Sequence, residues 1–313
     1  MTDFSVIIVT RNTRALTCAA VRSVYAAPQP LAKEIIVVDN GSEDDTPQQL
    51  PREFPQVKYI RSEKNLGFAR ANNLGAQQAT GEFLVLLNSD ARVQPETLGT
   101  GIAWMRSHPD CGVAGAQLLN PDGSRQNSIA NFPSLATELI NKSLLRRLFP
   151  RRFPGKEHQL NSPLEVESLI GAFLLIRRET WTHLGGFDER FFFFLEETDF
   201  CLQAQRHGWK VMHLPQLQVW HERGRSAAQW PGAARIEYWR SRYQFFRKNR
   251  PLLARGVLRC GLGARLAADS LASAVMFVVT LGRSSRWRHQ WGVNRALVVW
   301  HIRGCPVDMG LPR

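Results

Sequence analysis

The chain has 313 residues, and its hydrophobic content of 44% excludes a wholly disordered chain and is enough for a large core. Its formal net charge of +13 is unevenly placed. Residues 223–313 hold 17 Lys and Arg against 3 Asp and Glu, whereas residues 1–222 hold 23 against 24. A nearly neutral body is therefore followed by a strongly basic region, which predicts a polyanionic partner such as a nucleic acid or an anionic membrane surface.

Short apolar runs alternate with helical patterns in the first 90 residues. The runs with strand character are 4–10, 34–39, 57–60 and 82–87, and the helical segments between them include 14–27 and 68–79. This alternation predicts an α/β fold, a Rossmann-like and mostly parallel sheet with helices on both faces. Further along the chain, we expect helices at 95–107 and 196–207, a turn at 120–123 flanked by 113–118 and the segment from Ser124, and regular structure at 166–176 and 179–184.

Two later segments differ in character from this body. Residues 132–163 contain four prolines and a basic cluster (Arg146, Arg147, Arg151 and Arg152), which predicts a mobile loop over the active face. Beyond residue 223 the pattern is helical, aromatic and basic. We therefore expect a domain at 1–226, which includes the mobile loop, and a basic helical region at 227–313.

The cysteines and the apolar runs give information on the cellular compartment of the protein. The five cysteines are widely spaced, and no pair has redox or metal-ligand spacing, so we expect reduced thiols. The first residues lack a secretory-signal pattern. The most apolar stretch, 266–282, is interrupted by Asp269 and small residues, which favours a segment on a membrane over one across it. These features predict a cytoplasmic protein.

The segment Asn88-Ser89-Asp90 follows a strand-like run directly. In open α/β sheets, ligands bind beyond the carboxyl ends of the strands, so these polar side chains are candidates for a binding site. Asp90 is a hard oxygen donor of the kind that holds Mg²⁺ or Mn²⁺ against a phosphate. The alternative is a turn former or a helix N-cap.

Asp39 closes the second predicted strand in the same way. A carboxylate there can accept hydrogen bonds from a base or a ribose, and its alternative is an Asx-turn before Asn40-Gly41. No G-x-G-x-x-G follows the first strand and no P-loop is present, which argues against a dinucleotide site.

Two asparagines interrupt the helical pattern that begins after Gly67. Asn72 and Asn73 are unfavourable inside a helix by some tenths of a kcal/mol each, so they predict amides that face a ligand or a solvent-exposed pair.

Three carboxylates, Glu196, Glu197 and Asp199, begin a helix behind an aromatic run. Acidic residues in a first turn complement the helix dipole. The apolar setting also predicts burial of at least one carboxyl, which would raise its pKa toward that of a useful base. His221 ends a late strand and is followed by Arg223, Gly224 and Arg225. This composition suits a metal and a diphosphate, and a structural histidine is the alternative.

These motifs, in this order, resemble the inverting family 2 glycosyltransferases of GT-A fold, in particular their bacterial rhamnosyltransferase-like branch. The matching landmarks lie between residues 4 and 226, at 6–12, 37–42, 65–68, 87–90, 171–178, 185–189, 196–199 and 221. The resemblance implies displacement at the anomeric carbon of a nucleotide-activated sugar in cell-surface polysaccharide synthesis. The donor it implies is dTDP-rhamnose or a UDP-sugar, and the acceptor is a glycan or a polyprenyl-diphosphate-linked glycan.

The resemblance also assigns roles to residues. The donor-binding residues it implies are Thr10, Arg11, Asn12, Asp39, Asn65, Gly67, Phe68, Asn72, Asn88, Ser89 and Asp90. Asp90 and His221 would bind Mg²⁺ or Mn²⁺. Glu197 matches the general base, with Asp199 in reserve, and Gly171, Ala172 and Glu196 would lie near the acceptor. Asn88 stands where many relatives have Asp, and Arg11 where Tyr is usual.

The basic region offers two interpretations. Residues 236–250 place Trp239, Tyr243 and Phe246 on one helix face with arginines around them, which is typical of a helix that lies on a membrane. The same face could instead pack on the catalytic domain. With the first interpretation, the protein would be peripheral on the inner face of the cytoplasmic membrane.

Two other functions compete with a transferase. A non-catalytic lipid- or nucleic-acid-binding protein on a decayed transferase fold fits the charge, but the joint presence of Asp39, Asp90, Glu197 and His221 argues against it. Nucleic acid is accordingly not expected as a partner. A nucleotidyltransferase would carry a Gly-rich phosphate loop near the first strand, and this sequence has none there.

Overall fold

The computed structural model describes residues 2–27, 31–149, 161–222 and 230–313. The chain forms two compact units. The sheet unit comprises Met1–Phe132, Pro154–Phe192 and Glu196–Ser226, and the helical unit comprises Pro133–Phe153, Phe193–Leu195 and Ala227–Arg313.

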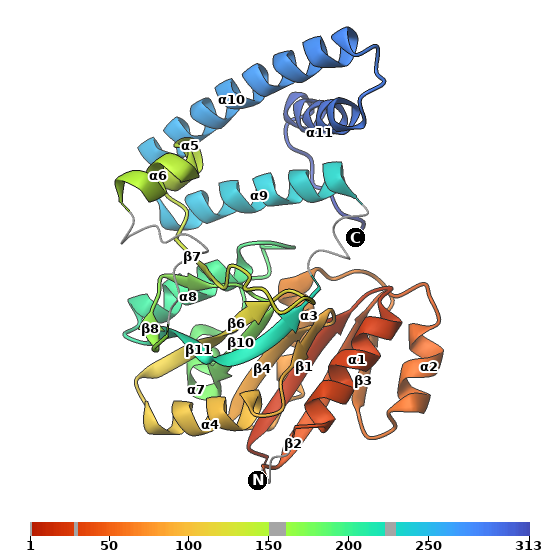
Figure 1. Ribbon diagram of the computed structural model, residues 1–313, viewed down its shortest axis with the longest axis vertical. Helices are drawn as coiled ribbons and strands as arrows, with labels where there is room; N and C mark the ends of the chain where they lie inside the picture. The colour runs from red at the N-terminus through yellow and green to blue at the C-terminus, as the bar shows by residue number, and fades with distance from the viewer. Residues whose placement is uncertain (1, 28–30, 150–160, 223–229) are drawn as a thin grey trace. The chain divides into compact units, whose positions relative to one another are not determined.

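The sheet unit is built on one large mixed sheet (Figure 1). Its strands are β1 (Phe4–Thr10), β2 (Lys33–Asn40), β3 (Lys58–Ser62), β4 (Phe83–Asn88), β5 (Ala91–Val93), β6 (Cys111–Leu119), β8 (Leu164–Glu165), β10 (Phe173–Arg177) and β11 (Lys210–His221). The order is β3-β2-β1-β4-β10-β6-β11-β5, with β8 paired to β11. The first four strands are parallel, as are β6 and β11, whereas β10 lies antiparallel between β4 and β6. A small separate sheet joins β7 (Ile129–Ala130) and β9 (Ser168–Leu169).

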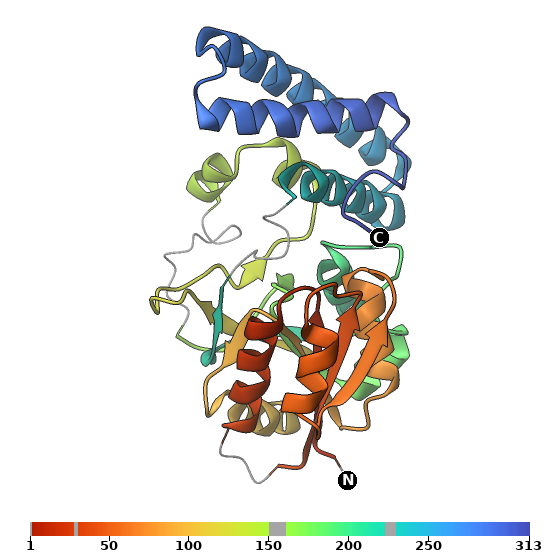
Figure 2. The ribbon, with the colours of Figure 1, turned by 90° about the vertical axis from the view of Figure 1, so that its right-hand side faces the viewer.

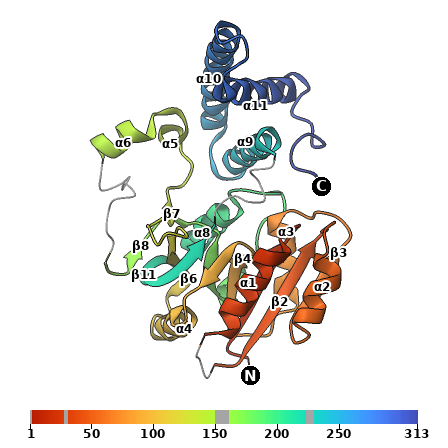
Figure 3. The ribbon, with the colours of Figure 1, turned by 45° about the vertical axis from the view of Figure 1, so that its right-hand side comes forward.

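Helices cover both faces of this sheet (Figure 3). They are α1 (Arg14–Tyr25), α2 (Thr46–Glu53), α3 (Phe68–Gln77), α4 (Thr97–Ser107), α7 (Arg178–Leu184) and α8 (Glu196–Arg206). Apolar residues of α1, α2 and α4 share one core with Val6 and Ile8, and those of α3, α7 and α8 share the other with Ile7. Because both faces are buried, the strands read as continuous apolar runs. The predicted fold class is confirmed.

The helical unit contains α5 (Leu135–Leu139), α6 (Lys142–Leu148), α9 (Pro231–Asn249), α10 (Leu252–Val279) and α11 (Ser285–Ile302). The expected irregular loop at 132–163 thus contains two short helices, and its residues 150–160, with Arg151 and Arg152, lie outside the described residues. The two units part at residues 226 and 227, where the sequence predicted a division, but residues 133–153 and 193–195 group with the basic region and not with the sheet unit. A capping box between Ser134 and Thr137 begins α5, which is a local signal for that helix.

The aromatic face of α9 is buried within the helical unit itself. Trp239 and Phe246 are at most 5% exposed, and the Tyr243 ring stacks on Trp300 of α11 with ring centroids 6.2 Å apart. The sequence analysis offered a membrane surface or the catalytic domain as the partner of this face. In the structure its partners include α11 of the same unit instead. The neighbouring helix α10 packs with α11 on one side (Figure 2), but it leaves Leu271, Val278 and Val279 about 70% exposed.

Helix α10 is long and apolar enough to cross a membrane by length and composition, and 17% of its most apolar window is buried. The interruption at Asp269 that argued against such a segment lies inside this continuous helix. All five cysteines are free thiols, as expected.

Candidate functional site

The polar residues at the strand ends lie along one edge of the sheet. Thr10 ends β1 opposite Asp39 of β2, and Asn88 ends β4 opposite Val9. This is the edge at which open α/β sheets bind ligands. At the far side, β11 brings His221 beside Ala91, the residue after Asp90.

Asp90 and His221 are neighbours in space although 131 positions separate them in sequence. His221 Nε2 lies 3.4 Å from Asp90 Oδ1, and each side chain is 10% exposed. The backbone fixes this approach, because Glu222 N donates to Asp90 O at 2.9 Å next to the β5–β11 pairing. The structure thus brings together the two residues predicted to bind a metal.

Gln126 determines which ring nitrogen of His221 carries the proton when the imidazole is neutral. Its side-chain nitrogen donates to two carbonyls, His221 O at 2.5 Å and Leu119 O at 3.3 Å. Its Oε1 therefore faces His221 Nδ1, at 3.1 Å, and requires a proton on that nitrogen. A neutral His221 then directs the lone pair of Nε2 at the carboxylate. A cation between these two acceptors, either a proton or a metal ion, would stabilise them at this distance.

This geometry fits a divalent ion. Two adjacent ligands of an octahedral Mg²⁺ or Mn²⁺ lie about 3 Å apart when each bond is about 2.1 Å, close to the observed separation. Asn88 Oδ1 is buried and, among the described residues, accepts no hydrogen bond. The described part of the chain holds no group of three His, Cys, Asp or Glu side chains able to bind a metal. Asp90 and His221 would supply part of the shell of such an ion, and a bound diphosphate or water the rest.

The three carboxylates that begin α8 have different environments. Glu196 and Asp199 are 5% and 2% exposed, whereas Glu197 is half-buried. Gly171 lies beside Glu197, since a Cβ at residue 171 would lie 3.4 Å from Glu197 Cγ. Accessibility thus favours Glu197 over Asp199 for contact with a substrate.

One hydrogen bond connects Glu197's surroundings to the predicted metal site. Asn88 N donates to Ala172 O at 3.0 Å, and Ala172 follows the glycine that touches Glu197. The predicted acceptor residues Gly171 and Ala172 are therefore adjacent to both groups, although Ala172 itself is buried. Glu196 is also buried, so a direct contact with an acceptor would need a rearrangement.

A cluster of hydroxyls lies between β1 and the Asn88–Asp90 segment. Thr10 Oγ1 is 2.7 Å from Thr17 Oγ1 and 3.0 Å from Thr13 Oγ1, which donates to Ser89 Oγ at 3.1 Å. Thr10 and Ser89 are thus held by protein partners and are nearly buried. The next residues on β1's edge, Arg11 and Asn12, are more accessible, and Asn12 Oδ1 accepts from Glu43 N at 2.7 Å.

Asp39 is fully buried. It forms a turn, which was the alternative to its predicted contact with a nucleotide. Its Oδ1 accepts from Ser42 N at 2.8 Å, and its Oδ2 accepts from the Tyr59 hydroxyl. Burial and this carboxylate raise the pKa of Tyr59. A contact between Asp39 and a nucleotide stays a prediction.

Asn40 anchors the loop that precedes α3. Its amide nitrogen donates to Asn65 Oδ1 at 2.8 Å, and its Oδ1 accepts from Leu66 N at 2.7 Å. Gly67 adopts φ +82° and packs so closely on Phe192 that a Cβ would lie 2.4 Å from Phe192 O. Phe68 N donates to the same carbonyl, at 2.7 Å. Asn65, Gly67 and Phe68 therefore form a tightly held segment.

The solvent-exposed alternative for Asn72 is wrong, and a contact between its amide and a ligand stays a prediction. Asn72 is 1% exposed and donates to Phe68 O of its own helix at 2.9 Å. Asn73 also serves the fold, because its side chain donates to Phe187 O and accepts from Phe187 N. These amides bind backbone groups that the sequence pattern does not reveal.

Sequence reasoning missed Gln126 and Asn40. Gln126 lies in an irregular segment after a turn, with no pattern to distinguish it, whereas Asn40 follows Asp39 directly and its place at a strand end was a usable signal. Arg223, Gly224 and Arg225, which were predicted to suit a diphosphate, lie outside the described residues.

An open α/β sheet with these side chains beyond its strand ends is GT-A architecture, and solved structures share it. A mannosyltransferase of Pyrobaculum calidifontis, solved with GDP-Man and Mn²⁺, aligns with 97% of this chain and 88% of its own, at a TM-score of 0.55 and 18% identity. S. aureus TarS 1-349 aligns with 97% of this chain and 92% of its own, at a TM-score of 0.54 and 17% identity.

The sequence identifies the family. Residues 5–184, more than half of the chain, match Glycosyl transferase family 2, and the chain belongs to this family. A relative in Mycobacterium tuberculosis, N-acetylglucosaminyl-diphospho-decaprenol L-rhamnosyltransferase, is 28% identical over 268 residues, which are 80% of this chain and 86% of the relative. The chain lies in the rhamnosyltransferase-like branch of the family.

Proposed function

We propose that this protein transfers a sugar, with rhamnose from dTDP-rhamnose as the first choice, to a polyprenyl-diphosphate-linked glycan with inversion. The observation that carries the proposal is the link from Asn88 N to Ala172 O, because it joins the Asp90–His221 pair to the surroundings of Glu197. A site for a leaving diphosphate and a base for an acceptor are then neighbours. The name of the mycobacterial relative supports the lipid-linked acceptor and the rhamnose.

In this proposal Asp90 and His221 hold Mg²⁺ or Mn²⁺, and Gln126 orients the imidazole of His221. The ion would neutralise the charge that builds on the leaving diphosphate. The mannosyltransferase neighbour was solved with Mn²⁺, which agrees with this choice of metal.

Glu197 would act as the general base. Its carboxylate takes the proton of the acceptor hydroxyl while that oxygen forms a bond to the anomeric carbon and the bond from this carbon to the diphosphate breaks. Attack opposite the leaving group inverts the anomeric configuration, and the nucleoside diphosphate departs with the bonding electrons. Gly171 leaves room beside Glu197, since a larger side chain there would contact the carboxylate's own stem.

The proposal places the protein at the cytoplasmic face of a membrane, where it would act in cell-surface polysaccharide synthesis. The exposed apolar side of α10, rather than the aromatic face of α9, would make the membrane contact. Arginines of the same unit would meet anionic headgroups.

The test is a transfer assay with the full chain, Mn²⁺, a polyprenyl-diphosphate-linked GlcNAc and a panel of dTDP- and UDP-sugars. We expect one donor to be used, with rhamnose first, and an NMR-determined product anomer opposite to that of the donor. Retained configuration would contradict the single displacement. Specific binding of lipid without transfer from any donor would favour the decayed, lipid-binding alternative.

A further inference from the structure

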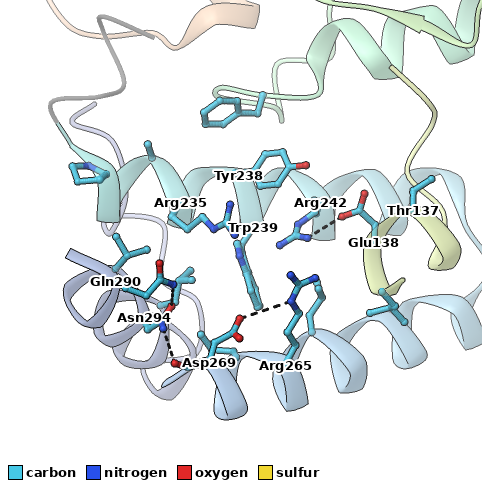
Figure 4. Close-up of a pocket in the computed structure, with 18 of the residues that line it drawn as sticks. Thr137, Glu138, Arg235, Tyr238, Trp239, Arg242, Arg265, Asp269, Gln290 and Asn294 are labelled. Atoms are coloured by element: carbon cyan, nitrogen blue, oxygen red, sulfur yellow. Dashed lines mark hydrogen bonds and ion pairs between the residues drawn. The ribbon is translucent and has the colours of Figure 1, made fainter. Parts of the chain in front are cut away.

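The helical unit contains a cavity of about 1150 Å³ that is open to solvent and is lined by α5, α9, α10 and α11 (Figure 4). Its volume is in the range of, or slightly above, that of sites for drug-sized ligands. Apolar side chains from three helices, among them Leu139, Leu262 and Leu297, line part of the wall. Charged groups line another part, so the cavity has the two-sided character of a site for an amphiphile.

Three arginines face this cavity, two from α9 and one from α10, as Figure 4 shows. Arg242 pairs with Glu138 at 2.8 Å, and Arg265 lies 3.8 Å from Asp269. Arg235 makes no ion pair with any residue that the structure describes. The lining therefore holds more guanidinium groups than carboxylates.

The environment of Arg235 favours an added anion. Partial burial lowers the pKa of Arg235, the charges of Arg242 and Arg265 lower it further, and Asp269 acts in the opposite direction. These like charges repel each other across the cavity, and a bound anion would relieve the repulsion.

Two buried donors at the cavity also lack acceptors. Arg242 is 6% exposed and Trp239 is 5% exposed, yet Arg242 Nε and Trp239 Nε1 have no hydrogen-bond partner among the described residues. A buried donor without an acceptor costs roughly 1–3 kcal/mol, so such groups in a native structure call for a partner. An oxyanion that enters between α9 and α10 would supply it once the side chains that cover these two atoms move aside. Both groups can only donate a hydrogen bond, so the missing partner must be an acceptor.

We propose that this cavity binds a membrane lipid that carries a phosphate or diphosphate headgroup. The headgroup lies among Arg235, Arg242, Arg265 and the indole of Trp239, and the first part of the chain lies along the leucines. The exposed apolar residues of α10, such as Leu271 and Val278, lie in the bilayer from which the lipid enters. The inference rests on the proposed function for the choice of a lipid-linked diphosphate, and it gives that lipid a binding site in this chain.

The site is also connected to the predicted base along the chain. Phe194 lines the cavity, its ring lies 5.5 Å from that of Tyr238, and Phe193 O accepts from Ser241 Oγ at 2.8 Å. Glu197 follows Phe194 by three residues. A lipid in the cavity would thus contact the segment that leads into α8.

The test measures binding of soluble probes to the full chain by calorimetry, with EDTA and without sugar donor, so that metal-dependent binding at Asp90 does not contribute. The probes are farnesyl diphosphate, pyrophosphate and farnesol. We expect farnesyl diphosphate to bind at least tenfold more tightly than either of the others. Equal binding of pyrophosphate would overturn the lipid assignment in favour of a free-anion site, and equal binding of farnesol would overturn the role of the arginines.

Matched variants locate the site. Arg235→Gln and Arg265→Gln, both at accessible positions, should each weaken farnesyl diphosphate binding at least tenfold, whereas Arg295→Gln, an exposed α11 arginine outside the cavity, should change it less than twofold. Equal effects of all three would overturn the proposal. This binding experiment measures no sugar transfer, so its failure would leave the transferase proposal standing. Conversely, absence of transfer in the separate assay, together with intact lipid binding here, would reject only the transferase proposal.

Discussion

His221 Nε2 and Asp90 Oδ1 lie 3.4 Å apart, with the histidine's other nitrogen held by Gln126. The pair joins the end of β11 to the residue before β5, so it depends on the pairing of these two strands. A cation between the two groups would also add to the stability of the sheet unit.

Asp90→Asn is expected to remove the metal dependence of nucleotide binding. In the wild type, Mn²⁺ should raise the affinity for a nucleoside diphosphate, and the neutral amide should reduce this gain at least about tenfold because it is a poorer ligand. Calorimetry with Mn²⁺ or EDTA measures both affinities. Asp122→Asn, on an exposed turn, is the control and should match the wild type. Equal nucleotide binding by the wild type with and without Mn²⁺ would refute the metal site.

Gln126→Leu is expected to weaken apparent Mn²⁺ affinity about 10- to 100-fold, although Gln126 touches no metal in the proposal. Its loss frees Nδ1 of His221, so the imidazole no longer presents one fixed tautomer. Nitrogen-15 NMR of the metal-free protein should show a proton on Nδ1 in the wild type and mixed tautomers in the variant. Unchanged tautomer populations together with unchanged Mn²⁺ affinity would show that Gln126 has only a structural role.

Glu197→Gln should lower the rate of transfer by about 10²–10⁴-fold, which is the usual contribution of a general base, with donor affinity within a few-fold of the wild type. The matched change Asp199→Asn should retain far more activity, because Asp199 is 2% exposed while Glu197, beside Gly171, is only half-buried. Steady-state rates and donor binding separate the two effects. A dead Asp199→Asn and an active Glu197→Gln would reverse the assignment.

The sheet unit was predictable because both faces of its strands are buried, which leaves continuous apolar runs such as 4–10 that end in polar residues. The pairing of Asp90 with His221 was also predictable, since both follow strands at one edge. The role of Gln126 was not, because it depends on where two carbonyls lie. The helical unit was misjudged for a related reason: periodicity shows that α9 has an aromatic face, but not that α11 covers it.

His213 should make the protein less stable as pH falls below about 6.5. It is 1% exposed on β11, and burial, assisted by nearby Arg125, lowers its pKa from 6.5 to about 4. Between these values the unfolded chain binds a proton that the folded chain does not, so the free energy of unfolding increases with pH in this range. The difference of about 2.5 pKa units corresponds to about 3 kcal/mol lost between pH 7 and pH 4. Urea unfolding of the wild type and His213→Phe at several pH values tests this, because other titrating groups are common to both. The wild type should lose about 2–3 kcal/mol more than the variant over this range, and parallel pH profiles would mean that folding does not lower the pKa of His213.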